Sequence, residues 1–362
     1  MAINFSRAFK FVVPASLAAL LAITLQVFFF SPIKDPNFLQ LPSKSSLLPA
    51  NNLLQGVTKL GEGFLKRPED VWVDKEGVLY TATGDGWIKR LHKNGSWEEW
   101  KKIDSSSILG ITSSKDGGLI VCDVEKGVLK VNEEGITFLT SHVNGTNIRF
   151  ADDVIEASDG SLYFSVASTK FELSNWYLDL LEARPHGQLL KYNPLLDETS
   201  IVLDGLGFAN GVALSKDEDY LVVCETWRFR CLKYWLKGEA SGKTEIFVQN
   251  LPGGPDNINL ADDGSFWIAL LHLTADGLEF VHTSKLAKHL AATFLSLTKL
   301  INGTTRKATV VKVAADGTIL KIFDDSQGKT ISSVTSAFEF EDHLYLGSLT
   351  SNFVGKLSLK DA

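Results

Sequence analysis

Apolar and polar positions alternate in a pattern that recurs along most of the chain. Short stretches rich in β-branched and aromatic residues are separated by polar turns, which is typical of β-hairpins. Each repeat contains an apolar doublet, at Leu79-Tyr80, Leu119-Ile120, Leu162-Tyr163, Tyr220-Leu221, Phe266-Trp267 and Leu344-Tyr345. A segment that joins a basic residue to apolar neighbours follows each doublet, at Lys89-Arg90-Leu91, Leu129-Lys130-Val131, Leu190-Lys191-Tyr192, Leu232-Lys233-Tyr234, Val311-Lys312-Val313 and Gly355-Lys356-Leu357. Six copies in one register indicate a repeat architecture.

A unit of roughly 40 residues, built of short strands and turns, is typical of a propeller blade. The pattern therefore predicts an all-β fold, a six-bladed β-propeller over residues 56–362 with four strands per blade. The last copy has room for only three strands. We expect the short strand at 56–60 to supply its fourth strand, which would close the ring and remove an exposed edge.

The residue at the start of each innermost strand stands ten positions before its doublet. By this spacing the six residues are Glu69, Leu109, Asp152, Asn210, Asp256 and Val334. Innermost strands line the channel of a propeller, so these residues are expected to converge. Four of the six carry carboxylate or carboxamide oxygen atoms.

Those four residues form a candidate calcium site. Ca²⁺ takes about six to eight oxygen ligands in loose geometry, which suits Glu69, Asp152, Asn210 and Asp256 arranged in a ring, with Asn257 as a fifth candidate ligand. Three carboxylates gathered without a cation would repel one another and lose hydration. The alternative is that these oxygen atoms cap strand ends and bond to the backbone of turns.

Two repeats carry insertions with helical spacing of apolar residues. The first runs from 169 to 186, and the second from 272 to 305. Within the second, residues 283–295 predict an amphipathic helix. Long insertions with their own structure often cover binding sites, so we expect helical lids over the channel mouth. The alternative for the second helix is that it lies on a bilayer.

The N-terminal 55 residues differ from the repeats. Arg7 and Lys10 precede an uncharged segment at 11–33 that contains the roughly 20 apolar residues needed to span a bilayer. We expect a cytoplasmic tail at 1–10, a transmembrane signal anchor at 11–33 and an extended linker at 34–55. A cleaved signal peptide is the alternative to the anchor. Either places the propeller on the lumenal side of the endomembrane system, in the endoplasmic reticulum membrane or the vacuole.

Charge and cysteine content narrow the function classes. A formal net charge of −7 and the lack of a basic stripe argue against nucleic-acid binding. Three cysteines exclude a disulfide-built scaffold. Cys224 and Cys231 flank a tight turn, where they form either a cross-strand disulfide or two buried thiols. Candidate glycosylation sites are Asn94, Asn144 and Asn302, each in an Asn-x-Ser/Thr triplet.

Several motifs carry a resemblance to a known family. They are Phe150-Ala151-Asp152-Asp153-Val154, Gly207-Phe208-Ala209-Asn210-Gly211-Val212, Pro255-Asp256-Asn257-Ile258 and His343-Leu344-Tyr345-Leu346-Gly347-Ser348. From about residue 56 onward the chain resembles the strictosidine synthase-like proteins of plants and the adipocyte plasma membrane-associated proteins of animals. The family fold is a six-bladed propeller. More distantly the chain is similar to paraoxonases and gluconolactonases, and this likeness implies calcium ligands at Glu69, Asp152, Asn210, Asp256 and Asn257.

The chain departs from these relatives at two catalytic positions. The glutamate that drives amine–aldehyde condensation in true strictosidine synthases falls on Thr335, which cannot act as that acid or base. The catalytic histidine of paraoxonases falls on Leu109. The resemblance therefore leaves the calcium centre as the expected source of activity.

We expect a calcium-dependent hydrolase that acts on an ester or lactone of a small apolar substrate. By resemblance to the gluconolactonases, Asp256 is the expected catalytic base, with Asp153 as the second candidate. One alternative is a non-enzymatic, membrane-tethered binding propeller with structural calcium. Another is residual strictosidine synthase-type condensation. The sequence predicts no oligomeric state.

Overall fold

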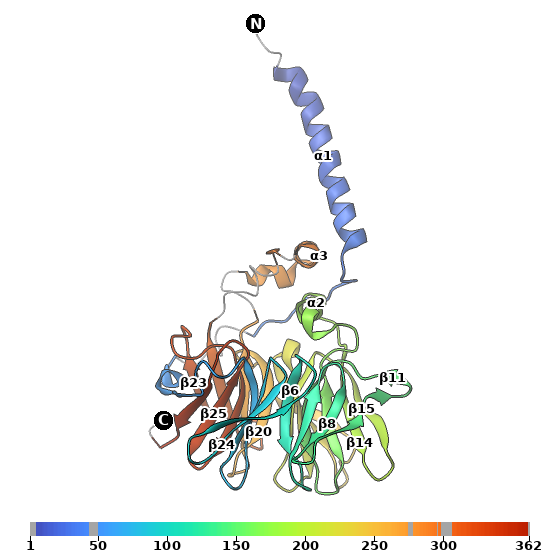
Figure 1. The fold of residues 1–362 in the computed structure, drawn as a ribbon. Helices are drawn as coiled ribbons and strands as arrows, with labels where there is room; N and C mark the ends of the chain where they lie inside the picture. The colour runs from blue at the N-terminus through green and yellow to red at the C-terminus, as the bar shows by residue number, and fades with distance from the viewer. Residues whose placement is uncertain (1–4, 43–49, 274–277, 295, 298–305, 361–362) are drawn as a thin grey trace.

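The structure is a computed structural model that describes residues 5–42, 50–273, 278–294, 296–297 and 306–360. It contains a six-bladed β-propeller and one long helix, α1 (Phe5–Phe30), which extends away from one end of the propeller (Figure 1). This arrangement confirms the predicted all-β fold and the apolar N-terminal helix. Within α1, Val13–Phe30 is long and apolar enough to cross a membrane, and 6% of that segment is buried.

Each blade is a four-stranded antiparallel sheet. Blades one to three contain β2 (Pro68–Val73), β3 (Leu79–Thr83), β4 (Trp87–Leu91) and β5 (Trp97–Lys102); β6 (Ile108–Ser113), β7 (Leu119–Asp123), β8 (Gly127–Val131) and β9 (Ile136–Thr140); and β12 (Ala151–Glu156), β13 (Leu162–Val166), β14 (Gly187–Asn193) and β15 (Glu198–Leu206). Blades four to six contain β16 (Ala209–Leu214), β17 (Tyr220–Glu225), β18 (Arg230–Trp235) and β19 (Thr244–Val248); β20 (Gly254–Leu260), β21 (Phe266–Leu271), β22 (Ala308–Val313) and β23 (Ile319–Asp325); and β24 (Val334–Phe340), β25 (His343–Ser348), β26 (Val354–Ser358) and β1 (Thr58–Leu60). The doublets lie at the start of the second strands and the basic segments in the third strands, as the repeat predicts.

The N-terminal strand closes the ring. β1 pairs antiparallel with β26, with Thr58 opposite Lys356 and Leu60 opposite Val354. The preceding 3₁₀ helix η2 (Leu53–Gly56) buries Leu54 completely. The prediction that residues 56–60 complete the last blade is therefore confirmed, and no outer strand of that blade is missing among the described residues.

Apolar layers between neighbouring blades form the core. The layer between blades four and five, for example, contains Val222, Ile258, Phe266, Ile268 and Val311. Because each sheet packs against a neighbour on both faces, its middle strands are apolar almost throughout. This explains why the sequence pattern marks the middle strands so clearly.

Both insertions fold at the end of the propeller where the innermost strands begin. The first contains η3 (Leu173–Asn175) and α2 (Trp176–Glu182), and the second contains η5 (Glu279–Thr283) and α3 (Lys285–Thr293). The side chain of Ser284 caps α3 by accepting a hydrogen bond from the backbone N–H of Ala287 at 3.3 Å. Figure 1 shows that α1 leaves from this same end. Smaller elements are η4 (Thr226–Arg228) and the hairpin of β10 (His142–Val143) and β11 (Thr146–Asn147).

The segment after α1, residues 31–41, packs against the lid helices α2 and α3, and we call it the strap. It is extended, as predicted for the linker at 34–55, but Ile33 and Leu39 are buried. The backbone N–H of Asn37 donates to the carbonyl oxygen of Glu182 at 2.9 Å, and that of Leu39 donates to the carbonyl oxygen of His282 at 3.2 Å. The strap therefore ties both insertions together.

The structure decides between the two cysteine alternatives. Cys224 and Cys231 lie opposite each other on β17 and β18 and form a disulfide. Cys122 is a buried free thiol.

Candidate metal centre in the propeller channel

Near its start, the innermost strand of every blade is interrupted by a β-bulge. The residues at these irregularities are Glu69-Asp70, Leu109-Gly110, Asp152-Asp153, Asn210-Gly211, Asp256-Asn257 and Thr335. Bulges redirect side chains and recur beside functional sites. All five predicted calcium ligands, Glu69, Asp152, Asn210, Asp256 and Asn257, therefore lie at one structural level of the ring.

In the last blade, the bulge does not lie at the residue that the ten-residue spacing predicts. The ten-residue spacing points to Val334 in the last blade, but Val334 pairs regularly with Ser348, and the irregularity falls on Thr335. The bulge of blade six contains one residue where the other blades have two. Thr335 is buried, and its hydroxyl donates to the carbonyl oxygen of Glu69 at 2.6 Å. Sequence spacing alone could not detect the missing residue.

A left-handed backbone conformation precedes four of the bulges. The residues that adopt it are Arg67 (φ 50°), Phe150 (φ 55°), Phe208 (φ 64°) and Ser333 (φ 47°). Each stands two positions before Glu69, Asp152, Asn210 or Thr335. A left-handed conformation costs roughly 1–2 kcal/mol for a residue other than glycine, so the same local backbone strain recurs beside four of the bulges.

Two glycines allow neighbouring inner strands to approach closely. A Cβ at Gly211 would lie 2.5 Å from the carbonyl oxygen of Asp256, and a Cβ at Gly110 would lie 2.7 Å from that of Asp152. Neither distance is compatible with a side chain. The glycines therefore place the ligand-bearing strand of the next blade directly beside their own.

Contacts across the channel bring the predicted ligands together. The Asn257 amide donates from blade five to Glu69 Oε1 in blade one, at 3.1 Å. Asn210 in blade four lies close enough to the Asp256 carboxyl group to lower its pKa. All of these side chains, with Asp152, are at most 4% exposed.

Four buried oxygen atoms in this cluster have no hydrogen-bond partner: Glu69 Oε2, Asn210 Oδ1, Asp256 Oδ2 and Asn257 Oδ1. Buried polar atoms are nearly always paired, because an unsatisfied one costs roughly 1–3 kcal/mol. Carboxylate and carboxamide oxygens are the ligands that Ca²⁺ prefers. The residues present therefore fit a hard cation.

The electrostatics of the cluster agree with this fit. Burial raises the pKa of Glu69 well above its ordinary value, and the charges of Asp70, Asp256 and Asp152 raise it further. Burial, followed by repulsion from Asp256, also raises the pKa of Asp152. Burial raises the pKa of Asp256 to about 8, although the Asn210 side chain opposes this shift. A bound cation would compensate the repulsion and allow all three groups to ionise.

Carboxylates alone do not make the site. In the part of the chain that the structure describes, no three histidine, cysteine, aspartate or glutamate side chains form a group that could hold a metal ion. A cation at the bulges would therefore depend on the carboxamides of Asn210 and Asn257 in addition to the acids.

Asp70 and Asp153 stand beside ligand positions but have a different environment. The carboxylate of Asp70 accepts hydrogen bonds from the backbone N–H groups of Val71 and Ile111, both at 2.8 Å. Asp153 accepts from Val154 at 2.8 Å and Val212 at 2.7 Å. Each carboxylate thus joins one blade to the next, from blade one to two and from blade three to four. For Asp153, the second predicted base, both oxygen atoms are engaged in these bonds.

An apolar layer lies between the bulges and the lid helices. It includes Leu109, Phe150, Phe208, Trp227 and the strap residue Leu39. The Phe208 and Trp227 rings stack with centroids 4.2 Å apart. Sequence analysis did not assign Leu39 to the site, although the apolar residues Leu39 and Leu41 within a polar linker were a signal.

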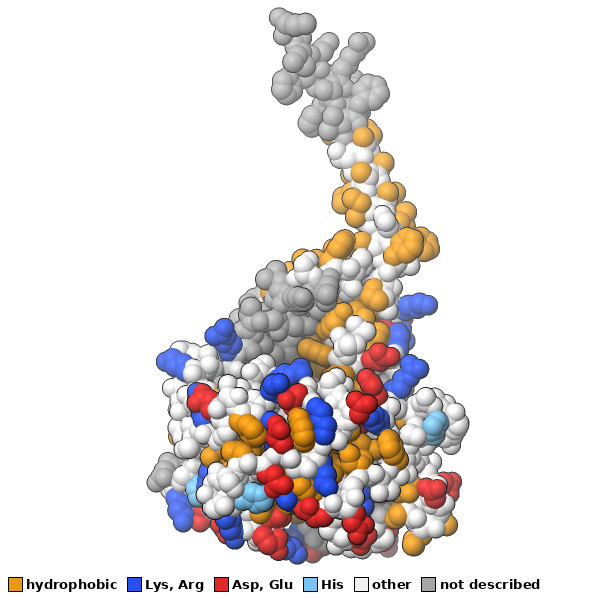
Figure 2. All heavy atoms as spheres, viewed as in Figure 1, with side chains coloured by type: hydrophobic (Ala, Val, Ile, Leu, Met, Phe, Trp, Pro, Cys, Tyr) orange, Lys and Arg blue, Asp and Glu red, His pale blue; other side chains and the backbone are white. Residues whose placement is uncertain are grey.

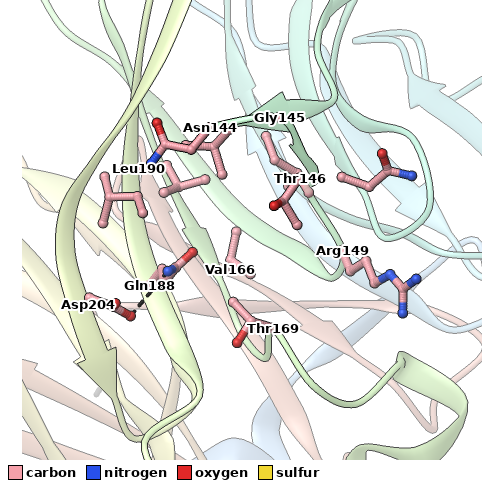
Figure 3. Close-up of a pocket in the computed structure, with 13 residues that line it drawn as sticks. Asn144, Gly145, Thr146, Arg149, Val166, Thr169, Gln188, Leu190 and Asp204 are labelled. Carbon is pink, nitrogen blue, oxygen red and sulfur yellow. Dashed lines mark hydrogen bonds between the residues drawn. The ribbon is translucent and has the colours of Figure 1, made fainter.

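Two concavities lie away from this layer. One of about 400 Å³ opens at the opposite end of the channel, between the innermost strands, and Asp153 lines it. The other, about 680 Å³, lies beside the β10–β11 hairpin, where Arg149, Thr169, Gln188 and Asp204 surround it (Figure 3). The polar side chains that line it are largely exposed. Among the labelled side chains, the Gln188 amide donates a hydrogen bond to Asp204 Oδ1 at 3.1 Å. This second pocket therefore lacks the buried, orphaned groups of the channel.

Two of the three predicted glycosylation sites are described. Asn94 and Asn144 are exposed in turns, and Asn144 also borders the pocket of Figure 3. Asn302 lies outside the described residues. Glycosylation of Asn94 and Asn144 stays a prediction, and both side chains are accessible to modification.

Fold and site together define a six-bladed propeller with a buried cluster of carboxylate and carboxamide side chains in its channel. Comparison with known proteins gives the family. The strictosidine synthase profile matches residues 152–239, and the profile for the N-terminal part of strictosidine synthase-like proteins matches residues 48–91. Protein STRICTOSIDINE SYNTHASE-LIKE 4 of Arabidopsis thaliana is 33% identical over 355 residues, which cover 94% of this chain and 93% of that protein. Adipocyte plasma membrane-associated protein of Mus musculus is 31% identical over 372 residues, covering 95% and 89%. The chain therefore belongs to the strictosidine synthase-like family.

Solved structures share the fold. A gluconolactonase from Xanthomonas campestris superposes with a TM-score of 0.61 at 13% identity, covering 91% of this chain and 99% of that one. Regucalcin from Agrobacterium tumefaciens, a calcium-binding protein, gives a TM-score of 0.55 at 13% identity, covering 83% and 90%. At these identities the likeness shows the propeller fold alone.

Proposed function

We propose that this strictosidine synthase-like protein is a calcium-dependent hydrolase of ester or lactone bonds in small apolar molecules. One observation carries the proposal: four buried oxygen atoms without partners, on Glu69, Asn210, Asp256 and Asn257, lie at the bulges of three blades, where Asn257 contacts Glu69 across the channel. The names gluconolactonase and calcium-binding regucalcin, borne by proteins of the same fold, support it.

The expected ligands are Glu69, Asp152, Asn210, Asp256 and Asn257. A bound Ca²⁺ would polarise a substrate carbonyl group and stabilise the negative charge that develops on its oxygen. Asp256 has one buried carboxylate oxygen without a hydrogen-bond partner, so it can accept a proton from water. The apolar layer excludes bulk water and would contact the apolar part of the substrate.

Condensation of the strictosidine type is not supported by the same site. Thr335 stands where the resemblance places the condensing glutamate, and its hydroxyl is bonded to the backbone of Glu69. A threonine hydroxyl in that position supplies neither an acid nor a base near neutral pH.

Calorimetric titration of the chelator-stripped, full-length protein tests the metal. We expect wild type to bind calcium, Asp256→Ala to lose binding, and Asp116→Ala to bind like wild type, because Asp116 is an exposed acid on the outer surface. Bound calcium should also raise the melting temperature of wild type but not that of Asp256→Ala. Equal binding by wild type and Asp256→Ala, or none by either, would contradict the proposal.

A panel of aryl esters and lactones, assayed with and without chelator, tests the reaction. Hydrolysis that disappears with chelator and in Asp256→Ala is the expected result. Calcium binding without turnover of any member would show a structural metal instead and refute the hydrolase.

A further inference from the structure

The end of the propeller that carries α2 and α3 exposes large apolar side chains. Phe38, Phe280, Leu286, Phe294 and Leu297 are between 39% and 59% exposed, and we call these five side chains the lid face. In Figure 2 hydrophobic side chains continue from α1 onto this end of the molecule. Contiguous apolar groups of this kind on a protein surface mark an interaction site.

Helix α3 exposes a large apolar side chain and buries a lysine. Leu286 on α3 and Phe294, which directly follows the helix, are both exposed. Lys288, by contrast, is completely buried, and its Nζ donates to the carbonyl oxygen of Asn37 in the strap at 2.5 Å. A surface helix in water turns its apolar stripe inward and its lysines outward. Ala291 and Lys285 follow this rule, but Leu286 and Lys288 do not, which indicates an apolar environment beside Leu286.

The short connection between α1 and α3 identifies this apolar environment. Val27, near the end of α1, is buried, and the Phe28 ring lies 4.4 Å from the His289 ring of α3. Only Ser31 and Pro32 separate α1 from Ile33, which is buried among the lid helices. Three residue steps span at most roughly 10 Å. Wherever the apolar helix α1 enters a bilayer, α3 must lie beside that point.

Charged groups at the edge of the lid face suit a headgroup layer. Lys34 is exposed, and Lys285 and Arg184 both pair with Asp35 in the strap, with Lys285 Nζ at 2.8 Å. These three cations outnumber the one carboxylate of Asp35, and the carboxylate of Glu182 beside Lys34 is paired with Lys170. Basic residues next to an apolar patch bind the anionic groups of lipid surfaces.

We propose that the lid face is a membrane contact, seated in the interface of the bilayer that α1 crosses. The propeller is then held against the lipid by its lid helices as well as by the anchor. The partner is the lipid surface itself, and the contact does not depend on catalytic activity.

The test uses the full-length chain reconstituted in vesicles of phosphatidylcholine and phosphatidylserine. Single cysteines are placed at Leu286 and Phe294 and labelled with an environment-sensitive nitrobenzoxadiazole dye. Leu195→Cys is the matched control, because Leu195 is an exposed leucine in the β14–β15 turn at the opposite end of the propeller. Unsubstituted protein gives the background, since Cys122 is buried and Cys224 is bonded to Cys231.

We expect the dye at positions 286 and 294 to emit at shorter wavelength and to lose fluorescence when spin-labelled lipids are included. The dye at 195 should show neither change. Spectra and quenching at 286 and 294 that match those at 195 would overturn the proposal. Mature protein that lacks α1 would overturn it as well, because the short connection to the bilayer would not exist.

Discussion

Four buried acids at the bulges fall into two groups that differ in how their oxygen atoms are bonded. Asp70 and Asp153 have both oxygens bonded to backbone N–H groups of two blades. Glu69 and Asp256 each keep one oxygen without a partner. The first arrangement stabilises the junction between blades, whereas the second leaves a coordination position for a ligand. Adjacent residues at one bulge thus have separate roles.

Replacing Asp70 tests the structural role. Asp70→Ala leaves the buried N–H groups of Val71 and Ile111 without acceptors, so we expect a loss of roughly 2–4 kcal/mol in the free energy of unfolding. Asp116→Ala, at an exposed ion pair, should change it by less than about 0.5 kcal/mol. Chemical denaturation of both variants measures this difference. Equal stability of the two would show that the bonds between blades one and two are not important.

A buried carboxyl group also makes stability depend on pH. Asp179 of α2 accepts hydrogen bonds from Ser168 at 2.5 Å and from Trp227 Nε1 at 2.7 Å, and burial raises its pKa to about 6. Because this folded-state value lies above the ordinary 3.8, the folded protein binds the proton more tightly. The stabilising contribution is complete below pH 4 and is lost as the pH rises through 6.

We therefore expect the stability of Asp179→Asn relative to wild type to rise between pH 4 and pH 6. The total change should be about 3 kcal/mol, since each pKa unit corresponds to 1.36 kcal/mol. Unfolding curves of both proteins at several pH values measure it. The lost hydrogen bond of the asparagine shifts stability at all pH values, so a constant offset between the two curves would contradict the assigned pKa.

At the scale of elements, the strap is the connection on which the lid depends. Leu39 reaches the apolar layer above the bulges, while its neighbour Phe38 is 58% exposed. Leu39→Ala should weaken docking of the strap by about 2 kcal/mol or more, which corresponds to roughly 30-fold faster exchange of the Asn37 and Leu39 amide protons. Phe38→Ala is the matched control and should leave this exchange nearly unchanged in detergent.

Hydrogen exchange followed by mass spectrometry measures both variants. Exchange in the blades should remain as in wild type, because the strap is not part of their sheets. If Leu39→Ala exchanges no faster than Phe38→Ala, the strap is held by its backbone hydrogen bonds alone.

The blades could be predicted from the sequence, whereas the exact bulge residue of the last blade and the packing of the strap could not. The blades were predictable because strands such as β7 and β17 are buried on both faces, so their apolar pattern repeats without interruption. The predicted ring of ligands followed from the same period. Thr335 was missed as the sixth bulge residue, since a bulge changes the count by one without changing the pattern. The packing of Leu39 was missed because it depends on contacts more than 60 residues away in sequence.

At the scale of the whole molecule, helix α1, the lid helices and the propeller follow one another along one direction (Figure 1). The strap joins the first two, and the apolar layer joins the second to the third. A molecule that reaches the bulges from that end must therefore pass the lid helices and the strap. A membrane at this end would affect which molecules enter the channel.

The final prediction concerns the side of the membrane on which the propeller lies. Arg7 and Lys10, which precede the uncharged segment 11–33, favour a cytoplasmic N-terminus, and the disulfide of Cys224 and Cys231 is typical of an oxidising compartment. Asn94 and Asn144, exposed in turns, should then carry glycans. Each of Asn94→Gln and Asn144→Gln should lose one endoglycosidase-sensitive mass step, whereas Asn352→Gln, an exposed asparagine outside any such triplet, should lose none. The protein should also stay in the membrane pellet after alkaline carbonate extraction, as expected of a chain whose helix α1 is a transmembrane anchor. Release by carbonate would show that α1 is a cleaved signal, and a mass unaffected by endoglycosidase would argue against a lumenal propeller.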